Sequence, residues 1–308
     1  MSTPQRLPDA AVAFYQSGQR FSVAGVLEMR RLWHRVSLDD VDASWRVVQG
    51  DAVTVLAALQ VASAREAGGY VAEVLDEQGM AAPAVATVEP LAFARGSSGL
   101  PLTDVLATAP AAVKRAVGDG AREQALGRGL RLLEGITETH VADAARLATT
   151  ANIVARPAVT TWTRMLNPPS CGRCAVLAGV VYRWDASFQR HPRCDCRAVP
   201  STVAAGTGRL FDAHAYFDSL STAEQDARFG KVVAEQIRSG GDLVKAVNAP
   251  RDRWRVRLAD ERRAAKEAAA TQAATAQTPQ TFLESLIHQV NDRNTAIRKL
   301  ADAGYLAA

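Results

Sequence analysis

The stretch DAVTVLAALQVASAREAGGYVAEVLDEQG, residues 51–79, decides the fold class. Apolar side chains in and just before it recur with the 3.6-residue period of an α-helix and so share one face. These positions are Val48, Ala52, Val55, Leu59 and Ala62. Gly68 and Gly69 weaken the pattern, and Gly79 ends it, because glycine disfavours helix interiors. The spacing predicts a long amphipathic helix and therefore a mainly α protein.

Two further stretches predict neighbouring helices. Residues 121–152 repeat the same apolar spacing over more than eight turns, with leucines at 126, 130 and 133. Residues 24–37 predict a shorter helix that carries Trp33 and ends near the polar turn SLDDVDAS. Apolar helix faces pack on one another more often than on a partner protein. We therefore expect a helical N-terminal domain over residues 1–155.

The character of the sequence changes after Pro157. Three short β-branched and aromatic runs, AVTTWTRML, GVVYRWD and CDCRAVP, predict the strands of a small sheet. Residues 219–248 return to helix, where Ser221 and Glu224 have capping-box spacing and Gly240–Gly241 form a stop. Asp242 can cap the short helix that follows. These elements predict a second domain over residues 156–250.

The C-terminal residues 251–308 predict an arm. It comprises a basic helix, RDRWRVRLADERRAAKEAAA, a low-complexity linker, AATQAATAQTPQ, and a final helix around FLESLIHQV and AIRKLADAGYL. Residues 251–267 hold seven basic and four acidic side chains around Trp254. Such a run is usually a solvated helix face, and it could also lie on DNA or on an acidic protein surface. Its candidate contact residues are Arg251, Arg253, Arg255 and Arg257.

Composition excludes little. The chain has 36 basic and 32 acidic side chains, a net charge of +4 and a pI near 9.0, which is too mild to require a nucleic-acid partner. No run approaches the eighteen or so uninterrupted apolar residues of a membrane-spanning helix. The first residues also lack the basic-then-apolar order of a signal peptide. We expect the protein to have no membrane partner. We also expect it to be made and used in the cytoplasm.

All four cysteines lie between residues 171 and 196, together with one histidine. Cys171 and Cys174 form a Cys-x-x-Cys turn, and His191, Cys194 and Cys196 follow across the second predicted strand. Zinc is bound tetrahedrally by such thiolate and imidazole groups. Five candidate ligands exceed four positions, so one of Cys194 and Cys196 could lie outside the ligand set. The spacing leaves this choice open.

Two alternatives to a structural zinc fit less well. Disulfides need an oxidising compartment, for which the sequence has no export signal. Catalytic zinc needs an open coordination position and an acid or base, and the His-x-Glu of zinc deaminases is missing. We expect a closed zinc site that stabilises a sheet too poor in apolar residues to hold itself.

The segment RMLNPPSCGRCAVLAGVVYRWDASFQRHPRCDCRAVPS resembles the signature of the phage Mu F-type minor head proteins, the phage head morphogenesis family. The matching residues are Cys171, Cys174, Gly179, His191, Cys194 and Cys196. Residues 30–45 and 216–249 resemble actinobacterial-phage members. Asp195 departs from the usual Cys-Arg-Cys ending, which weakens a phosphate-contact role. The resemblance implies a helical N-terminal region, a small zinc-stabilised β/α unit over residues 156–250 and a helical C-terminal arm.

The resemblance also implies a function. Such a protein is a non-enzymatic minor capsid component, found at the head interior or portal vertex of the virion and in the host cytoplasm during assembly. It would assist head assembly, DNA packaging or ejection. Its expected partners are the portal protein, capsid or scaffold proteins and, nonspecifically, phage DNA. The alternative is a capsid maturation protease or a zinc-bearing nuclease, although DASFQRHPRC lacks the histidine pair and asparagine of HNH nucleases.

Overall fold

The computed structural model divides the chain into two compact units. The first comprises Met1–Met165, Val181–Thr207 and Gln280–Ala308, and the second comprises Leu166–Val180 and Gly208–Pro279. The sequence placed domain boundaries at residues 155 and 250, where the character of the sequence changes. These boundaries stay a prediction. The structure describes residues 8–165, 170–188, 190, 194, 196–201, 212–248, 281–288, 290 and 292–307.

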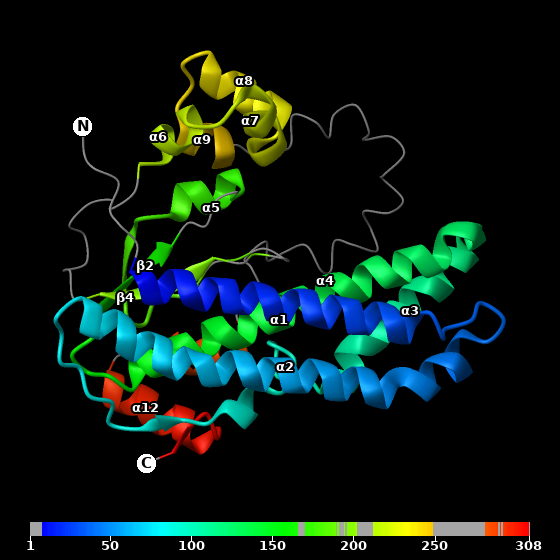
Figure 1. Ribbon diagram of the computed structural model, residues 1–308, viewed down its shortest axis with the longest axis horizontal. Helices are drawn as coiled ribbons and strands as arrows, with labels where there is room; N and C mark the ends of the chain where they lie inside the picture. The colour runs from blue at the N-terminus through cyan, green and yellow to red at the C-terminus, as the bar shows by residue number, and fades with distance from the viewer. Residues whose placement is uncertain are drawn as a thin grey trace. The chain divides into compact units, whose positions relative to one another are not determined.

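Four helices form the main body of the first unit (Figure 1). They are α1 (Asp9–Trp33), α2 (Val41–Glu77), α3 (Leu102–Gly118) and α4 (Arg122–Val154). Their apolar faces meet in one core, which includes Met29, Leu32, Trp33, Val48, Leu56, Leu106 and Leu133. The predicted helix of residues 51–79 is confirmed as part of α2, which continues through Gly68 and Gly69. The mainly α fold is likewise confirmed.

Two features of these helices differ from the prediction. Helix α1 begins at Asp9, well before residue 24, because the Glu77 carboxylate accepts hydrogen bonds of 2.8 Å from the backbone N–H groups of Asp9 and Ala10. These bonds replace the side-chain cap that Pro8 lacks. Helix α3 was not predicted, and it contains Pro110, a residue that usually ends a helix.

The described C-terminal segment is part of the first unit. Where one final helix was predicted, the structure has α11 (Phe282–His288) and α12 (Arg293–Asp302). The 3-10 helix η1 (Pro90–Phe93) follows strand β1 (Thr87–Val88), which pairs antiparallel with β5 (Leu306–Ala307). Arg293 donates to the Val159 carbonyl at 2.6 Å and lies 4.5 Å from the centre of the Trp184 ring. These contacts fix α12 beside the residues that follow α4.

The three predicted strands form one antiparallel sheet with the order β3-β2-β4. They are β2 (Thr161–Met165), β3 (Val181–Arg183) and β4 (Arg197–Ser201). Every residue of β4 is buried. Two side chains of the α2 region donate to its carbonyls, Tyr70 to Ala198 at 2.7 Å and Gln78 to Pro200 at 2.9 Å. The sheet is thereby attached to the helices of its own unit, and burial raises the pKa of Tyr70.

Gly18 in α1 lies directly against the side chain of Arg197. A Cβ atom at residue 18 would lie 2.3 Å from Arg197 Nη2, which is closer than real contacts allow. Arg197 is 1% exposed, so its guanidinium has little room to shift, and we expect Gly18→Ala to destabilise the protein by about 1–3 kcal/mol through overpacking, despite the better helix propensity of alanine. Chemical denaturation measures the change.

Gly50 in α2 gives the matched control. An added Cβ there would meet nothing within 4 Å. Gly50→Ala should therefore stabilise the protein by about 0.5–1 kcal/mol. Equal and favourable shifts for both variants would show that Gly18 does not contact a fixed arginine.

The described part of the second unit contains five short helices. They are α5 (Gly172–Leu177), α6 (Ala213–Asp218), α7 (Thr222–Phe229), α8 (Lys231–Arg238) and α9 (Leu243–Asn248). Their shared core includes Val176, Phe217, Ala234, Ile237 and Leu243. The predicted capping box of Ser221 and Glu224 is confirmed, as is the cap by Asp242. A Cβ at Gly172 would lie 2.6 Å from the Phe229 ring, which explains a glycine inside the Cys-x-x-Cys turn.

Helix α2 is long and apolar enough to cross a membrane by length and composition. One 18-residue window has a mean hydropathy of 1.4, and a third of that window is buried within the protein. Core helices that never meet lipid pass the same test, so this window is weak evidence for a membrane segment. The absence of a membrane partner stays a prediction.

Candidate metal centre

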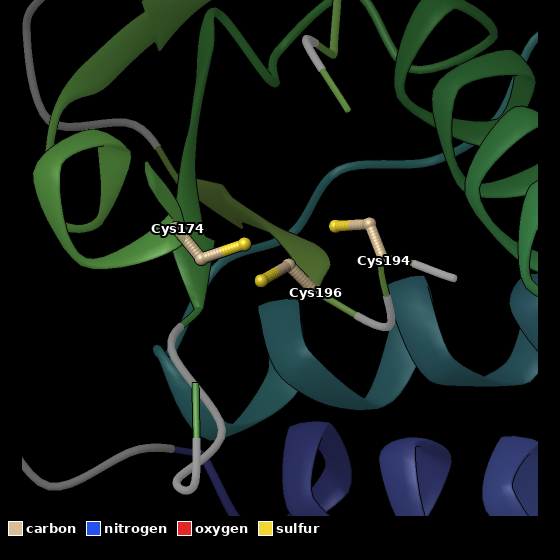
Figure 2. Close-up of side chains that lie close together, drawn as sticks. All are labelled: Cys174, Cys194 and Cys196. Carbon is tan, nitrogen blue, oxygen red and sulfur yellow. The ribbon is translucent and has the colours of Figure 1, made fainter. Parts of the chain in front are cut away.

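Three of the five predicted ligands come together. The Sγ atoms of Cys174, Cys194 and Cys196 all lie within 4.8 Å of one another, and all three side chains are buried. Figure 2 shows the three sulfurs pointing toward a common space. We call Cys174, Cys194 and Cys196 the cysteine cluster.

The cysteines of the cluster lie on or beside two elements. Cys174 lies on α5, in the segment that leaves β2 and re-enters the sheet as β3. Cys196 immediately precedes β4, whose first residue, Arg197, pairs with Met165 at the end of β2.

The donor chemistry of the cluster fits zinc. A Zn–S bond of about 2.3 Å in tetrahedral geometry separates two sulfurs by about 3.8 Å. Sulfurs within 4.8 Å of one another could reach that spacing through small side-chain rotations. Three thiols without an oxygen ligand select zinc or an iron–sulfur cluster over magnesium or calcium.

The fourth ligand is not fixed by the described residues. Cys171 precedes α5 as its N-terminal flanking residue and is half-buried, and its sulfur is not part of the cluster. His191 lies outside the residues that the structure describes. Cys194 and Cys196 both belong to the cluster, although the sequence suggested that one of them could be left out. The set of Cys171, Cys174, His191, Cys194 and Cys196 stays a prediction.

A buried ion-pair network beside Cys194 was missed by the sequence analysis. Arg146 on α4, whose side chain is 3% exposed, donates to the backbone carbonyl of Cys194 and to the carboxylate of Asp143. Asp143 is 2% exposed and also binds Arg190 and the Ser97 hydroxyl. Burial alone would lower the pKa of Arg146, but the charge of Asp143, then that of Cys194, raises it. We call Ser97, Asp143, Arg146 and Arg190 the Arg146 network.

The described arginines between residues 164 and 197 differ in their exposure. Arg164 and Arg197 are buried, with their guanidinium carbons 4.1 Å from the Phe188 ring centre and 5.6 Å from the Phe14 ring centre. Arg173 and Arg183 are exposed. Stacking of this kind stabilises a cation inside a protein. Burial makes Arg164 and Arg197 poor candidates for binding DNA phosphates.

The other predicted contact residues cannot be placed. Arg251, Arg253, Arg255 and Arg257 lie outside the described residues, as does the rest of the basic helix and the linker. Their role in binding DNA or a partner protein therefore stays a prediction.

One exposed pair resembles part of a hydrolase site. Ser187 Oγ lies 2.6 Å from Nε2 of His288 on α11. A catalytic serine also needs a group that orients the histidine. The nearby Glu284 carboxylate already accepts hydrogen bonds from the backbone N–H groups of Phe188 and Thr281. Of the residues that the structure describes, Ser187 and His288 therefore supply two of the three groups of such a site.

Fold and site together define a mainly helical protein with a buried, thiolate-rich cluster suited to a structural metal. The family model for VG15 protein matches residues 8–223, well over half of the 308 residues. The chain therefore belongs to the VG15 protein family, a family of phage virion-associated proteins. No curated protein and no solved structure matches the chain. The predicted phage origin is confirmed, whereas the Mu F-type identity stays a prediction.

Proposed function

We propose that this phage virion protein is a minor head protein of the Mu F type that associates with the portal vertex. It would assist head assembly, DNA packaging or ejection, with the portal protein and capsid or scaffold proteins as its partners. The observation that carries the proposal is the extent of the family match. Residues 8–223 include helices α1 to α4 and every cysteine, so the stretch of residues 164–201 that resembles head morphogenesis proteins falls inside the matched region.

The proposed role of the cysteine segment is structural. Cys174, Cys194 and Cys196 would hold zinc together with a fourth group, either Cys171 or His191. When bound, zinc would cross-link the segments that carry these ligands. The free energy of zinc binding would then stabilise the folded sheet. A ligand set filled by protein side chains leaves no position for an activated water, so the proposal is a non-enzymatic protein.

Copurification from infected cells tests the portal association. Tagged full-length protein should bring down the portal protein at few copies per head. A variant with Arg251, Arg253, Arg255 and Arg257 all changed to alanine separates the two roles of the basic helix. If this helix docks on the portal, the variant should recover less portal protein. If it contacts DNA, portal recovery should persist while the salt dependence of DNA binding becomes flatter. Recovery of tail proteins in place of the portal would contradict the proposal.

The enzymatic alternative has one supporting observation, the Ser187–His288 pair. Purified protein should leave casein and plasmid DNA intact, with or without magnesium, and Ser187→Ala should change neither result. Proteolysis by the wild type that disappears in Ser187→Ala would favour the capsid maturation protease.

A further inference from the structure

The Arg146 network joins a long helix to the cysteine segment. Arg146 is on α4, 48 residues before Cys194 in sequence, and its Nη1 donates to the Cys194 carbonyl. Its Nη2 donates to Asp143, one turn earlier on the same helix. Both side chains are almost fully buried. A buried guanidinium needs acceptors for its N–H groups, and the Cys194 carbonyl is one of the acceptors that Arg146 binds.

We propose that Arg146 is a positioning residue of the metal centre, one that fixes the backbone at Cys194 and offsets the negative charge of the bound thiolates. Asp143 in turn holds Arg146. This inference rests on the proposed zinc site. It adds that zinc affinity depends on a helix residue outside the cysteine segment.

Geometry supports the positioning role. The guanidinium is a planar fork that can bind two acceptors at once, whereas a lysine ammonium on a flexible stem lacks that fixed direction. Here one arm of the fork binds Asp143 and the other binds the backbone of a cluster residue. Ser97 donates to the second carboxylate oxygen of Asp143 and so limits its rotation. The Cys194 carbonyl is therefore held from α4, and the position of the Cys194 side chain follows from it.

Charge supports the second role. Three thiolates around one zinc ion leave a net charge of about −1, which is unfavourable in a buried site without compensation. Asp143 is paired with two arginines, Arg146 and Arg190. These three side chains together carry one more positive charge than negative charge. The network is therefore suited to stand beside metal-bound thiolates.

Zinc affinity of full-length variants tests the proposal. Arg146→Met keeps much of the side-chain volume and removes both the fork and the charge. Mutation of a residue that holds a metal ligand typically lowers metal affinity by about 10–100-fold. We expect a loss of zinc affinity in that range, measured by competition with a chromophoric chelator. Arg146→Lys should restore part of the affinity because it restores charge without the fork. Arg156→Met is the matched control, since Arg156 is half-buried after the end of α4 and bonds Asn152.

The cobalt-substituted protein gives a readout that a purely structural role would not change. Loss of a cation beside the thiolates should shift the sulfur-to-cobalt charge-transfer band in Arg146→Met and leave it unchanged in Arg156→Met. If the wild type binds one zinc and Arg146→Met binds it equally tightly with the same cobalt spectrum, the role of Arg146 is overturned and the metal site remains. If the wild type binds no zinc, the metal site itself is wrong. Ser97→Ala, which keeps every charge, provides a milder variant if Arg146→Met does not fold, and we expect weakened zinc binding in the same direction.

Discussion

Asp143→Ala should lower the free energy of unfolding by about 3–5 kcal/mol, the range expected when one member of a buried ion pair is removed. Asp143 is the carboxylate that pairs with Arg146 and Arg190, and its side chain is only 2% exposed. Its loss leaves the fully enclosed Arg146 charge without this partner. Urea denaturation of the reduced, metal-loaded protein measures the effect.

Asp51→Ala is the matched control for this variant. Asp51 lies 3.8 Å from Arg35, and the side chains are 65% and 49% exposed. Surface pairs of this kind contribute about 0–1 kcal/mol because solvent screens them. A loss below about 1 kcal/mol in Asp143→Ala would contradict the importance assigned to the Arg146 network.

Cys196→Ser should release the metal and destabilise the whole first unit. Structural zinc sites contribute apparent binding free energies of about 10–16 kcal/mol, so loss of one ligand should lower the Tm by on the order of 10 °C or more. If each helix were held by its own apolar face alone, the loosening would stay within residues 160–200. The hydrogen bonds from Tyr70 and Gln78 to β4 favour a wider effect that reaches α2.

Amide hydrogen exchange distinguishes the two outcomes for Cys196→Ser. We expect exchange to rise in α2 as well as in β4, because the two share those hydrogen bonds. Cys171→Ser is a second variant, and an effect as large as that of Cys196→Ser would identify Cys171 as the fourth ligand. Faster exchange in β4 with unchanged exchange in α2 would show that the sheet unfolds separately.

The parts of the fold that the sequence predicted are those set by local pattern. The apolar spacing of α2 and α4, the β-branched runs of the sheet and the Ser221–Glu224 capping box all depend on residues close in sequence. Helix α3 was missed because Pro110 reads locally as a stop, although here the surrounding helices hold it in place. The start of α1 depends on Glu77, 68 residues away, and no local pattern carries that information.

The candidate site divides in the same way. The spacing of the cysteines predicted a metal cluster, because several cysteines at Cys-x-x-Cys spacing within one short segment are typical of a metal site. Asp143 and Arg146 are three residues apart, the spacing of an ordinary surface ion pair on a helix. Only the fold shows that this pair is buried and binds the backbone of Cys194. A hint was available, since the pair falls within the apolar run VADAARLATT.

The metal content of freshly reduced, full-length protein tests the central claim of a structural zinc site most directly. Elemental mass spectrometry on protein purified without added metal should find about one zinc per chain, as a closed thiolate-rich set predicts. The protein should be colourless, and chelation should release the zinc together with the stability it supplies. Protein that is folded and reduced but carries no zinc, or a coloured protein that contains iron, would contradict the account.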